Sequence, residues 1–167
     1  MVPTIDRLRE LFSYDPETGV LVCRVARSNS IAGSEVGSIA SNGYMYVTVD
    51  YARMLVHRVI WAIHYGEYPE ADVDHEDRNK RNNRIINLRD ASRSQNNANS
   101  PAPSNNTSGI RGISWNARLG KWHAYISWHG ERRHLGFFDN LNDASRARVD
   151  AEMELFGKFA YKSELEA

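Results

Sequence analysis

The sequence predicts an α+β protein in two parts, and three features of the 167-residue chain support this expectation. In the first half, Val56, Val59, Ile60 and Ile63 recur with the period of a helix. In the second half, three stretches of alternating polarity predict strands, and an Ala-rich helix follows them. Between the halves, residues 98–108 (ANSPAPSNNTS) carry no large apolar side chain and have the composition of a linker.

The first half is expected to mix short helices and strands. Gly66 follows the helix predicted over 56–65 and is its expected C-terminal stop. Asn42-Gly43 is typical of a hairpin turn. The other elements expected here are a helix over 4–12, a turn over 14–19, and strands over 20–25 and 44–49.

The second half is expected to form a small sheet with one helix packed across it. Asn140 is a typical N-cap for that helix, and Gly157 is its expected end. The apolar face of the helix is predicted to consist of Ala144, Ala147, Ala151 and Leu155. The three strands are predicted over residues 113–116, 122–128 and 132–137.

Composition excludes several classes of protein. At 41% hydrophobic and 25% charged residues, the chain has the composition of a soluble globular protein. It has no apolar run of membrane-spanning length and no signal-peptide pattern, so we expect a cytoplasmic protein without a membrane partner. Cys23 is the only cysteine, which excludes disulfides within the chain and zinc sites built on cysteine pairs.

The charge pattern favours a nucleic-acid partner. Although the formal net charge is zero, residues 75–99 have a net charge of +3 and residues 107–134 of +4. Residues 1–74 and 135–167 are acidic, with net charges of −4 and −3. Two basic islands between acidic ends are typical of a nucleic-acid binder with a localised footprint, although a solvated surface can show the same pattern.

The candidate chemical centre lies in the first basic island. Asp74 can provide a hard oxygen ligand for a divalent cation, and the adjacent His75 titrates near neutral pH and can accept a proton. Ser92 and Gln95 form a capping-box pattern, which predicts a short helix that carries Asn96 as a second oxygen ligand. The alternative reading of the same residues is a surface histidine among asparagine-rich turns.

The stretch from His57 to Ala98 contains several motifs in a fixed order: His57-Arg58, Asp74-His75, the asparagine-rich loop over 79–83, Asn87-Leu88-Arg89 and the SRSQN helix start. With these motifs the stretch resembles the HNH nuclease family, more narrowly the type found in phage and intron-encoded homing endonucleases. The resemblance implies a ββα-metal fold in which a β-hairpin and a helix bind one divalent metal, Mg²⁺ or alternatively Mn²⁺. No small-molecule cofactor is expected.

The resemblance also implies a role for each matching residue. His75 would be the general base, Asp74 a metal ligand and Asn87 a brace for the loop that holds His75. Asn96 stands where many members have a histidine ligand, and the neighbouring Asn97 leaves open which amide faces the metal. The expected products are a 5′-phosphate and a 3′-hydroxyl. Arg84 and Arg93 are expected to contact DNA phosphates.

The segment from Gly109 to Tyr161 contains Arg111-Gly112-Ile113, Gly120-Lys121-Trp122, Leu135-Gly136-Phe137-Phe138 and the Ala-rich helix. With these motifs it resembles the plant ethylene-response-factor, or Apetala-type, DNA-binding domain. The resemblance implies a sheet that lies in the DNA major groove. Independently of the resemblance, alternation along the strands and side-chain chemistry suggest Arg132 for a guanine edge, Asn116 for an adenine edge and Lys121 for phosphate. The residues expected to face DNA are Arg111, Ser114, Asn116, Lys121, His123, Tyr125, Ser127, Arg132 and His134.

These inferences predict a metal-dependent, sequence-guided endonuclease that binds double-stranded DNA as a monomer, with a dimer as the alternative. The rival hypotheses are a catalytically inactive DNA-binding regulator and an RNA-binding protein. The expected organisation is a nuclease domain over 1–97, a linker over 98–108, a DNA-binding domain over 109–161 and a tail over 162–167.

Overall fold

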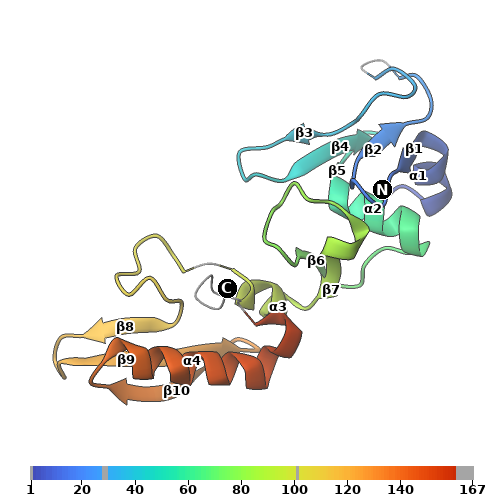
Figure 1. Cartoon of the computed structure of the whole chain (residues 1–167). Helices are drawn as coiled ribbons and strands as arrows, with labels where there is room; N and C mark the ends of the chain where they lie inside the picture. Colours follow the sequence, from blue (N-terminus) through green and yellow to red (C-terminus); the bar gives the residue numbers. More distant parts are fainter. Residues whose placement is uncertain (1, 28–29, 101, 161–167) are drawn as a thin grey trace. The chain divides into compact units, whose positions relative to one another are not determined.

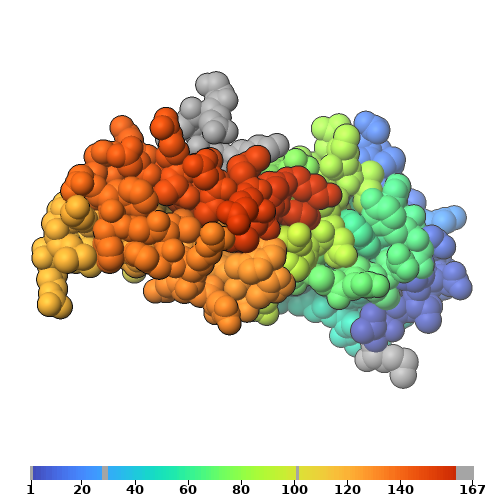
Figure 2. All heavy atoms as spheres, turned by 90° about the horizontal axis from the view of Figure 1, so that it is seen from below, coloured from blue at the N-terminus to red at the C-terminus, as the bar shows by residue number. Residues whose placement is uncertain are grey.

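A computed structural model describes residues 2–27, 30–100 and 102–160 of the chain. The residues divide into two compact units, Met1–Ala91 and Ser92–Ala167. Figure 1 shows their elements, and Figure 2 shows the atoms of each unit as a packed body, blue to green for the first and yellow to red for the second. The expected tail over 162–167 and Tyr161 lie outside the described residues.

The first unit begins with helix α1 (Ile5–Leu11), which the Thr4 side chain caps by accepting the Arg7 N–H. Strand β1 (Phe12–Tyr14) follows directly and pairs antiparallel with β2 (Leu21–Cys23). The predicted turn lies between them. Strand β1 was not predicted, because its three residues continue the apolar pattern of the helix.

A three-stranded antiparallel sheet follows, in the order β3 (Ser38–Ile39), β4 (Met45–Val49) and β5 (Ala52–Leu55). The predicted turn at Asn42-Gly43 connects β3 to β4. Helix α2 (Val56–Tyr65) begins directly after β5 and ends at Gly66, which has a φ of 79°, so the predicted helix and its stop are confirmed. Strand β5 was not predicted.

The core of the first unit lies between α1, α2 and the small sheets. Leu8, Phe12, Val59 and Ile60 are at most 1% exposed. Each buried leucine or isoleucine of this kind contributes about 1.5–3 kcal/mol to stability. Cys23 is also buried in this core as a free thiol.

The part of the first unit that carries the candidate centre is an antiparallel hairpin of β6 (Asp72–His75) and β7 (Leu88–Ala91). A short 3-10 helix, η1 (Ile85–Asn87), leads into β7. The register pairs His75 with Leu88 and Asp74 with Arg89. A twelve-residue loop therefore has to fold back between the two strands, and its own hydrogen bonds decide the shape of the site.

The second unit contains the predicted antiparallel sheet and the predicted helix. Its sheet has the order β10-β9-β8. Buried Ile113 and Ala124 on the sheet pack against Ala144 on the helix, as the alternating pattern predicts. The unit's elements are α3 (Arg93–Ala98), β8 (Ile113–Asn116), β9 (Lys121–Trp128), β10 (Glu131–Phe138), α4 (Leu141–Phe156) and η2 (Gly157–Phe159).

Three features of the second unit differ from expectation. Helix α3 groups with this unit, because the Ser94 side chain accepts the His129 N–H at 3.3 Å. The expected linker is partly packed, since Ala98 and Asn99 are 4% and 5% exposed. The Asn106 amide donates to two backbone carbonyls near β8. Composition alone misses this, because the segment packs through small and polar groups.

Helix α4 also buries two charged residues beside its predicted alanine face. Arg148 and Glu152, one turn apart, are 4% and 6% exposed. Their Nη1 and Oε1 atoms lie 2.8 Å apart as an ion pair. In the described part of the chain, no helix has both the length and the apolarity to cross a membrane.

Candidate active site and nucleic-acid interface

The His75 ring is held by a hydrogen bond from inside its own loop. His75 is 3% exposed at the end of β6, and its Nε2 lies 3.0 Å from Oδ1 of Asn83. Asn83 is 1% exposed, and its Nδ2 points to the sulfur of Met45 at 3.6 Å. Because an amide oxygen only accepts, Nε2 carries the proton and the lone pair of a neutral ring is on Nδ1. Nδ1 is therefore the atom that can take a proton.

Two aromatic rings surround His75. The His57 ring meets it edge to face with centroids 4.9 Å apart, and the Tyr44 ring lies 6.0 Å away. Burial lowers the pKa of His75, although the hydrogen bond to Asn83 opposes this shift. Burial, with smaller contributions from His75 and Arg58, lowers the pKa of His57 to about 3. Both rings are therefore neutral near pH 7.

Asn87 holds the loop between β6 and β7 together. Its Nδ2 donates to Asp77 Oδ1 at 2.9 Å and to the Asn82 carbonyl at 2.8 Å. Its Oδ1 accepts the Asp77 N–H at 3.1 Å. Burial favours the protonated acid, but hydrogen bonds from Asn82, Asn79 and Asn87 outweigh it and lower the pKa of Asp77. These bonds join Asn87 to Asp77 near the start of the loop and to Asn82 further along it. None of these bonds reaches His75.

Asp74 lies in a polar, buried position suited to a cation. Its side chain is 7% exposed, and Arg89 Nε and Nη2 both contact its Oδ2, at 2.9 and 2.8 Å. The Arg89 guanidinium therefore balances the charge of the Asp74 carboxylate. No cluster of three His, Cys, Asp or Glu side chains suited to a metal occurs within residues 2–27, 30–100 and 102–160. A metal at Asp74 would therefore need amide, water or phosphate oxygens, which are the ligands that Mg²⁺ takes.

The two candidate amides lie on α3, in the second unit. The predicted capping box is confirmed, with the Ser92 and Gln95 side chains each bonded to the other's backbone N–H. Asn96 is half-buried, whereas Asn97 is exposed and lines a cavity against the second unit's own sheet. The side-chain amides of Asn96 and Asn97 therefore lie in different surroundings. The pairing of Asn96 with Asp74 stays a prediction.

Several basic side chains near the loop have protein contacts. Lys80 Nζ donates to the Asn42 carbonyl at 2.9 Å and lies 4.6 Å from the centre of the Tyr44 ring. Arg84 is about half exposed, and its Nη2 lies 3.8 Å from a carboxylate oxygen of Glu17. Such a distant, exposed pair contributes little stability, so Arg84 can exchange this contact for a DNA phosphate.

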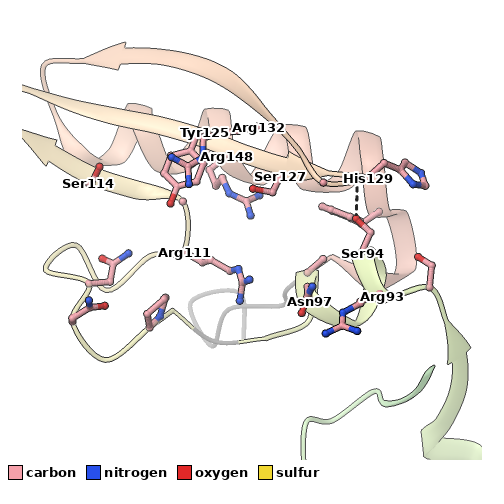
Figure 3. A pocket seen from close by; sticks show the side chains of 18 of the residues that line it. Arg93, Ser94, Asn97, Arg111, Ser114, Tyr125, Ser127, His129, Arg132 and Arg148 are labelled. Atoms are coloured by element: carbon pink, nitrogen blue, oxygen red, sulfur yellow. Dashed lines mark hydrogen bonds between the residues drawn. The ribbon is translucent and has the colours of Figure 1, made fainter. Parts of the chain in front are cut away.

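Six of the expected DNA-contacting side chains come together in one cavity of the second unit. The cavity has a volume of about 840 Å³ and lies between the sheet, α3 and the segment before β8 (Figure 3). Its walls include most of the sheet positions that alternation places away from α4. The expected residues that line it are Arg93, Arg111, Ser114, Tyr125, Ser127 and Arg132.

The other expected DNA-contacting residues of the sheet lie outside this cavity. Asn116 Oδ1 accepts the Leu119 N–H at 3.1 Å, so its amide already caps the β8–β9 turn. Lys121 Nζ pairs with exposed Asp139 at 3.0 Å. His123 Nε2 and His134 Nδ1 lie 2.9 Å apart, and the His123 ring stacks on Phe137. These residues form a second, open part of the sheet face.

The sequence analysis gave no site role to three residues of the first unit. Asn83 orients His75, Asp77 binds Asn87, and Arg89 balances Asp74. Arg89 could have been found, because antiparallel pairing of the two strands places it opposite Asp74. Asn83 and Asp77 lie in a loop whose composition predicts turns and does not say which side chains turn inward.

The family model described as HNH endonuclease matches residues 54–98. Protein 3.8 of Escherichia phage T7 is 32% identical over 105 residues, which cover 62% of this chain and 86% of that protein.

Among solved structures, one that describes DNA binding and cleavage by the HNH homing endonuclease I-HmuI matches with 26% identity. It covers 56% of this chain, and the TM-score is 0.41. The chain spans about half the length of that structure, at 53%.

Proposed function

We propose that the chain, which belongs to the family of phage T7 protein 3.8 and carries an HNH endonuclease domain over residues 54–98, is a divalent-metal-dependent DNA endonuclease. One observation carries this proposal. His75 is buried and neutral, and its bond to Asn83 puts the lone pair on Nδ1. A histidine held in one tautomer next to a carboxylate is what a general base in phosphodiester hydrolysis requires.

In this proposal, His75 Nδ1 takes a proton from the attacking water, and Asn83 keeps the ring in the correct tautomer. Asn87 and Asp77 keep the loop folded, so they act as positioning residues. Cleavage leaves a 5′-phosphate and a 3′-hydroxyl. Because there is one base, one strand is cut per event, and a double-strand break requires a second event.

HNH nucleases generally use a divalent metal, and we propose Asp74 and Asn96 as its protein ligands in this chain. The family match contains both residues. A metal held by these residues would stabilise the negative charge that develops during phosphodiester hydrolysis. The proposed donors are all oxygen atoms, which favours Mg²⁺ and accepts Mn²⁺. The distinct surroundings of Asn97 support Asn96 as the ligand.

We further propose that the second unit binds the DNA site through its sheet, as an Apetala-type domain would. Support comes from the basic and polar residues that share the sheet face away from α4, among them Arg132, Lys121 and His123. Phosphate contacts would supply affinity, and contacts to base edges would supply specificity. Arg93 and Arg84 would add phosphate contacts beside the cleavage site.

The second candidate function is a DNA-binding regulator without catalysis. The observation that favours it is Asn96, which stands at a position where the family often has a histidine. The two functions differ in one test. Supercoiled plasmid incubated with the protein and Mg²⁺ is nicked by an endonuclease, and a chelator such as EDTA abolishes nicking. A regulator binds the plasmid and leaves it supercoiled in both conditions.

The homing type is a finer proposal within the first function. It predicts that cleavage concentrates at a defined site in DNA that flanks the gene. Mapping the ends produced on that flanking DNA, beside an unrelated DNA of equal length, tests this proposal. Uniform cutting of both DNAs would contradict it and leave the nuclease assignment intact.

A further inference from the structure

The cavity of the second unit has the size of a small-molecule site, and most of its lining residues are polar or basic. Its volume of about 840 Å³ lies within the range of about 300–1,000 Å³ that ligand pockets occupy. One side is the β8–β10 sheet face, and the other is α3 with part of the segment over 103–107. The His129 N–H bond to Ser94 fixes α3 to the sheet (Figure 3).

The wall is basic, although the charge of Arg148 is balanced by its ion pair with buried Glu152, which does not line the cavity. Four arginines from four different segments line it, and its described lining includes no aspartate or glutamate. Figure 3 shows the arginine side chains around the space between the sheet and α3. Such convergence suits an anion with more than one charged or polar group. The four residues are Arg93, Arg111, Arg132 and Arg148.

Arg148 is the strongest sign of a built site. It is 4% exposed, and its Nε has no hydrogen-bond partner in the described part of the chain. Gly112, with a φ of 77°, lines the cavity at this point, and a Cβ there would lie 2.7 Å from Nε and 2.3 Å from the Tyr125 carbonyl oxygen. Glycine thus leaves open the approach to a buried donor that lacks an acceptor. Such a donor is costly unless a ligand accepts from it.

The sheet side of the cavity also offers a flat surface. The Arg132 guanidinium lies 4.2 Å from the centre of the Tyr125 ring. Stacked guanidinium and aromatic planes are surfaces on which proteins place unpaired bases. Ser127 on β9 and Asn97 on α3 add short polar groups to the same wall.

We propose that this cavity binds a nucleotide of a single DNA strand, with a phosphate on Arg111 and Arg148 and a base against the Arg132–Tyr125 pair. A volume of about 840 Å³ suits one nucleotide. The inference rests on the proposed function in one respect, that the second unit binds DNA. It divides the sheet face in two, with duplex contacts on the open part around His123 and Lys121 and a strand in the cavity.

The test uses the full-length protein and changes one exposed residue on the cavity wall. Thr107→Glu places a carboxylate among the arginines, and Thr107→Gln has the same shape without the charge. Binding to a labelled oligothymidine of about ten nucleotides is measured by fluorescence anisotropy. We expect Thr107→Glu to weaken binding about tenfold and Thr107→Gln to stay within about twofold of the wild type. Equal affinity for both variants would overturn the proposal.

Two further measurements separate the alternatives. Thymidine monophosphate as a competitor distinguishes a strand from a free nucleotide. If the oligothymidine binds no more tightly than the monophosphate, the strand assignment is overturned. Plasmid nicking with Mg²⁺ is measured on the same variants. If Thr107→Glu weakens oligothymidine binding but no variant nicks the plasmid, the cavity proposal is supported and the nuclease proposal is contradicted. If the proteins nick the plasmid but Thr107→Glu and Thr107→Gln bind alike, the nuclease proposal is supported and the cavity proposal is contradicted.

Discussion

The rings of His57 and His75 meet edge to face, with their centroids 4.9 Å apart, inside the first unit. His57 is 4% exposed on α2, and burial holds its pKa at about 3. A neutral His57 packs against the proposed base without competing for its proton. Helix α2, which the sequence predicts from its period alone, therefore supports the site through one buried ring.

The first prediction concerns stability against pH. Since the pKa of His57 is about 6.5 when unfolded and about 3 when folded, the unfolded chain binds more protons between these values. Stability from this residue is complete above about pH 6.5 and falls as the pH falls, by up to about 1.4 kcal/mol per pH unit. Urea unfolding at about pH 7 and about pH 5 measures this slope.

The matched variant is His57→Phe, which keeps a ring in the core and removes the titrating group. Its free energy of unfolding is expected to depend less on pH over the same interval. The lowered pKa of His75 acts in the same direction, so a smaller slope remains. Identical slopes for the two proteins would show that the pKa of His57 is not lowered by folding.

The second prediction concerns the tautomer of His75. Asn83→Ala removes the acceptor for Nε2–H and lets the ring proton move to Nδ1. We expect the cleavage rate to fall by about 10–100-fold, with duplex affinity unchanged. Asn83→Asp keeps an acceptor at this place and is expected to retain more activity than Asn83→Ala. Single-turnover nicking rates measure the ranking, and the reverse order would contradict the role of Asn83.

The third prediction concerns the metal. Asp74→Ala and Asn96→Ala are each expected to raise the Mg²⁺ concentration that half-maximal cleavage needs, whereas Asn97→Ala is not. Asn96→His restores the ligand common in the family and should keep measurable activity with altered preference between Mg²⁺ and Mn²⁺. Titration of each metal against the nicking rate measures both effects. If Asn97→Ala is inactive and Asn96→Ala is active, Asn97 is the metal ligand and Asn96 is not.

The fourth prediction concerns the division of the chain. Because α3 bonds to the turn after β9 and Ala98 is buried, a fragment over 92–167 should be more stable than one over 105–167. We expect a difference of about 1–2 kcal/mol in the free energy of unfolding, from one hydrogen bond and a small apolar contact. Chemical denaturation of the two fragments measures it. Equal stability would show that α3 contributes nothing to this unit.

Elements with strong local signals were predictable from the sequence. The period of Val56, Val59 and Ile60 with Gly66 behind it predicts α2 to the residue, and Ser92 with Gln95 predicts the capping box. Strands β8 to β10 follow from alternation, because one face of their sheet is buried. In contrast, β1 and β5 adjoin helices and have no separate pattern, so only tertiary pairing reveals them.

The site was predictable where chemistry is local and not where it depends on loop shape. The adjacent carboxylate of Asp74 and imidazole of His75 predict a reactive site from the sequence alone, and the family resemblance adds Asn87 and Asn96. The partners Asn83 and Asp77 depend on how a loop of polar residues folds back, which composition does not encode. Arg148 was missed because a charged residue on a polar helix is normally exposed, and its burial depends on the sheet beneath it.

The most direct test of the account is the effect of His75→Ala on strand cleavage. Relaxation of supercoiled plasmid is followed under excess protein with Mg²⁺, and duplex affinity is measured in parallel. The account predicts a rate about 10²–10⁴-fold below the wild type, with affinity unchanged within about twofold. If His75→Ala relaxes the plasmid at the wild-type rate, His75 is not the base, and the central claim is wrong.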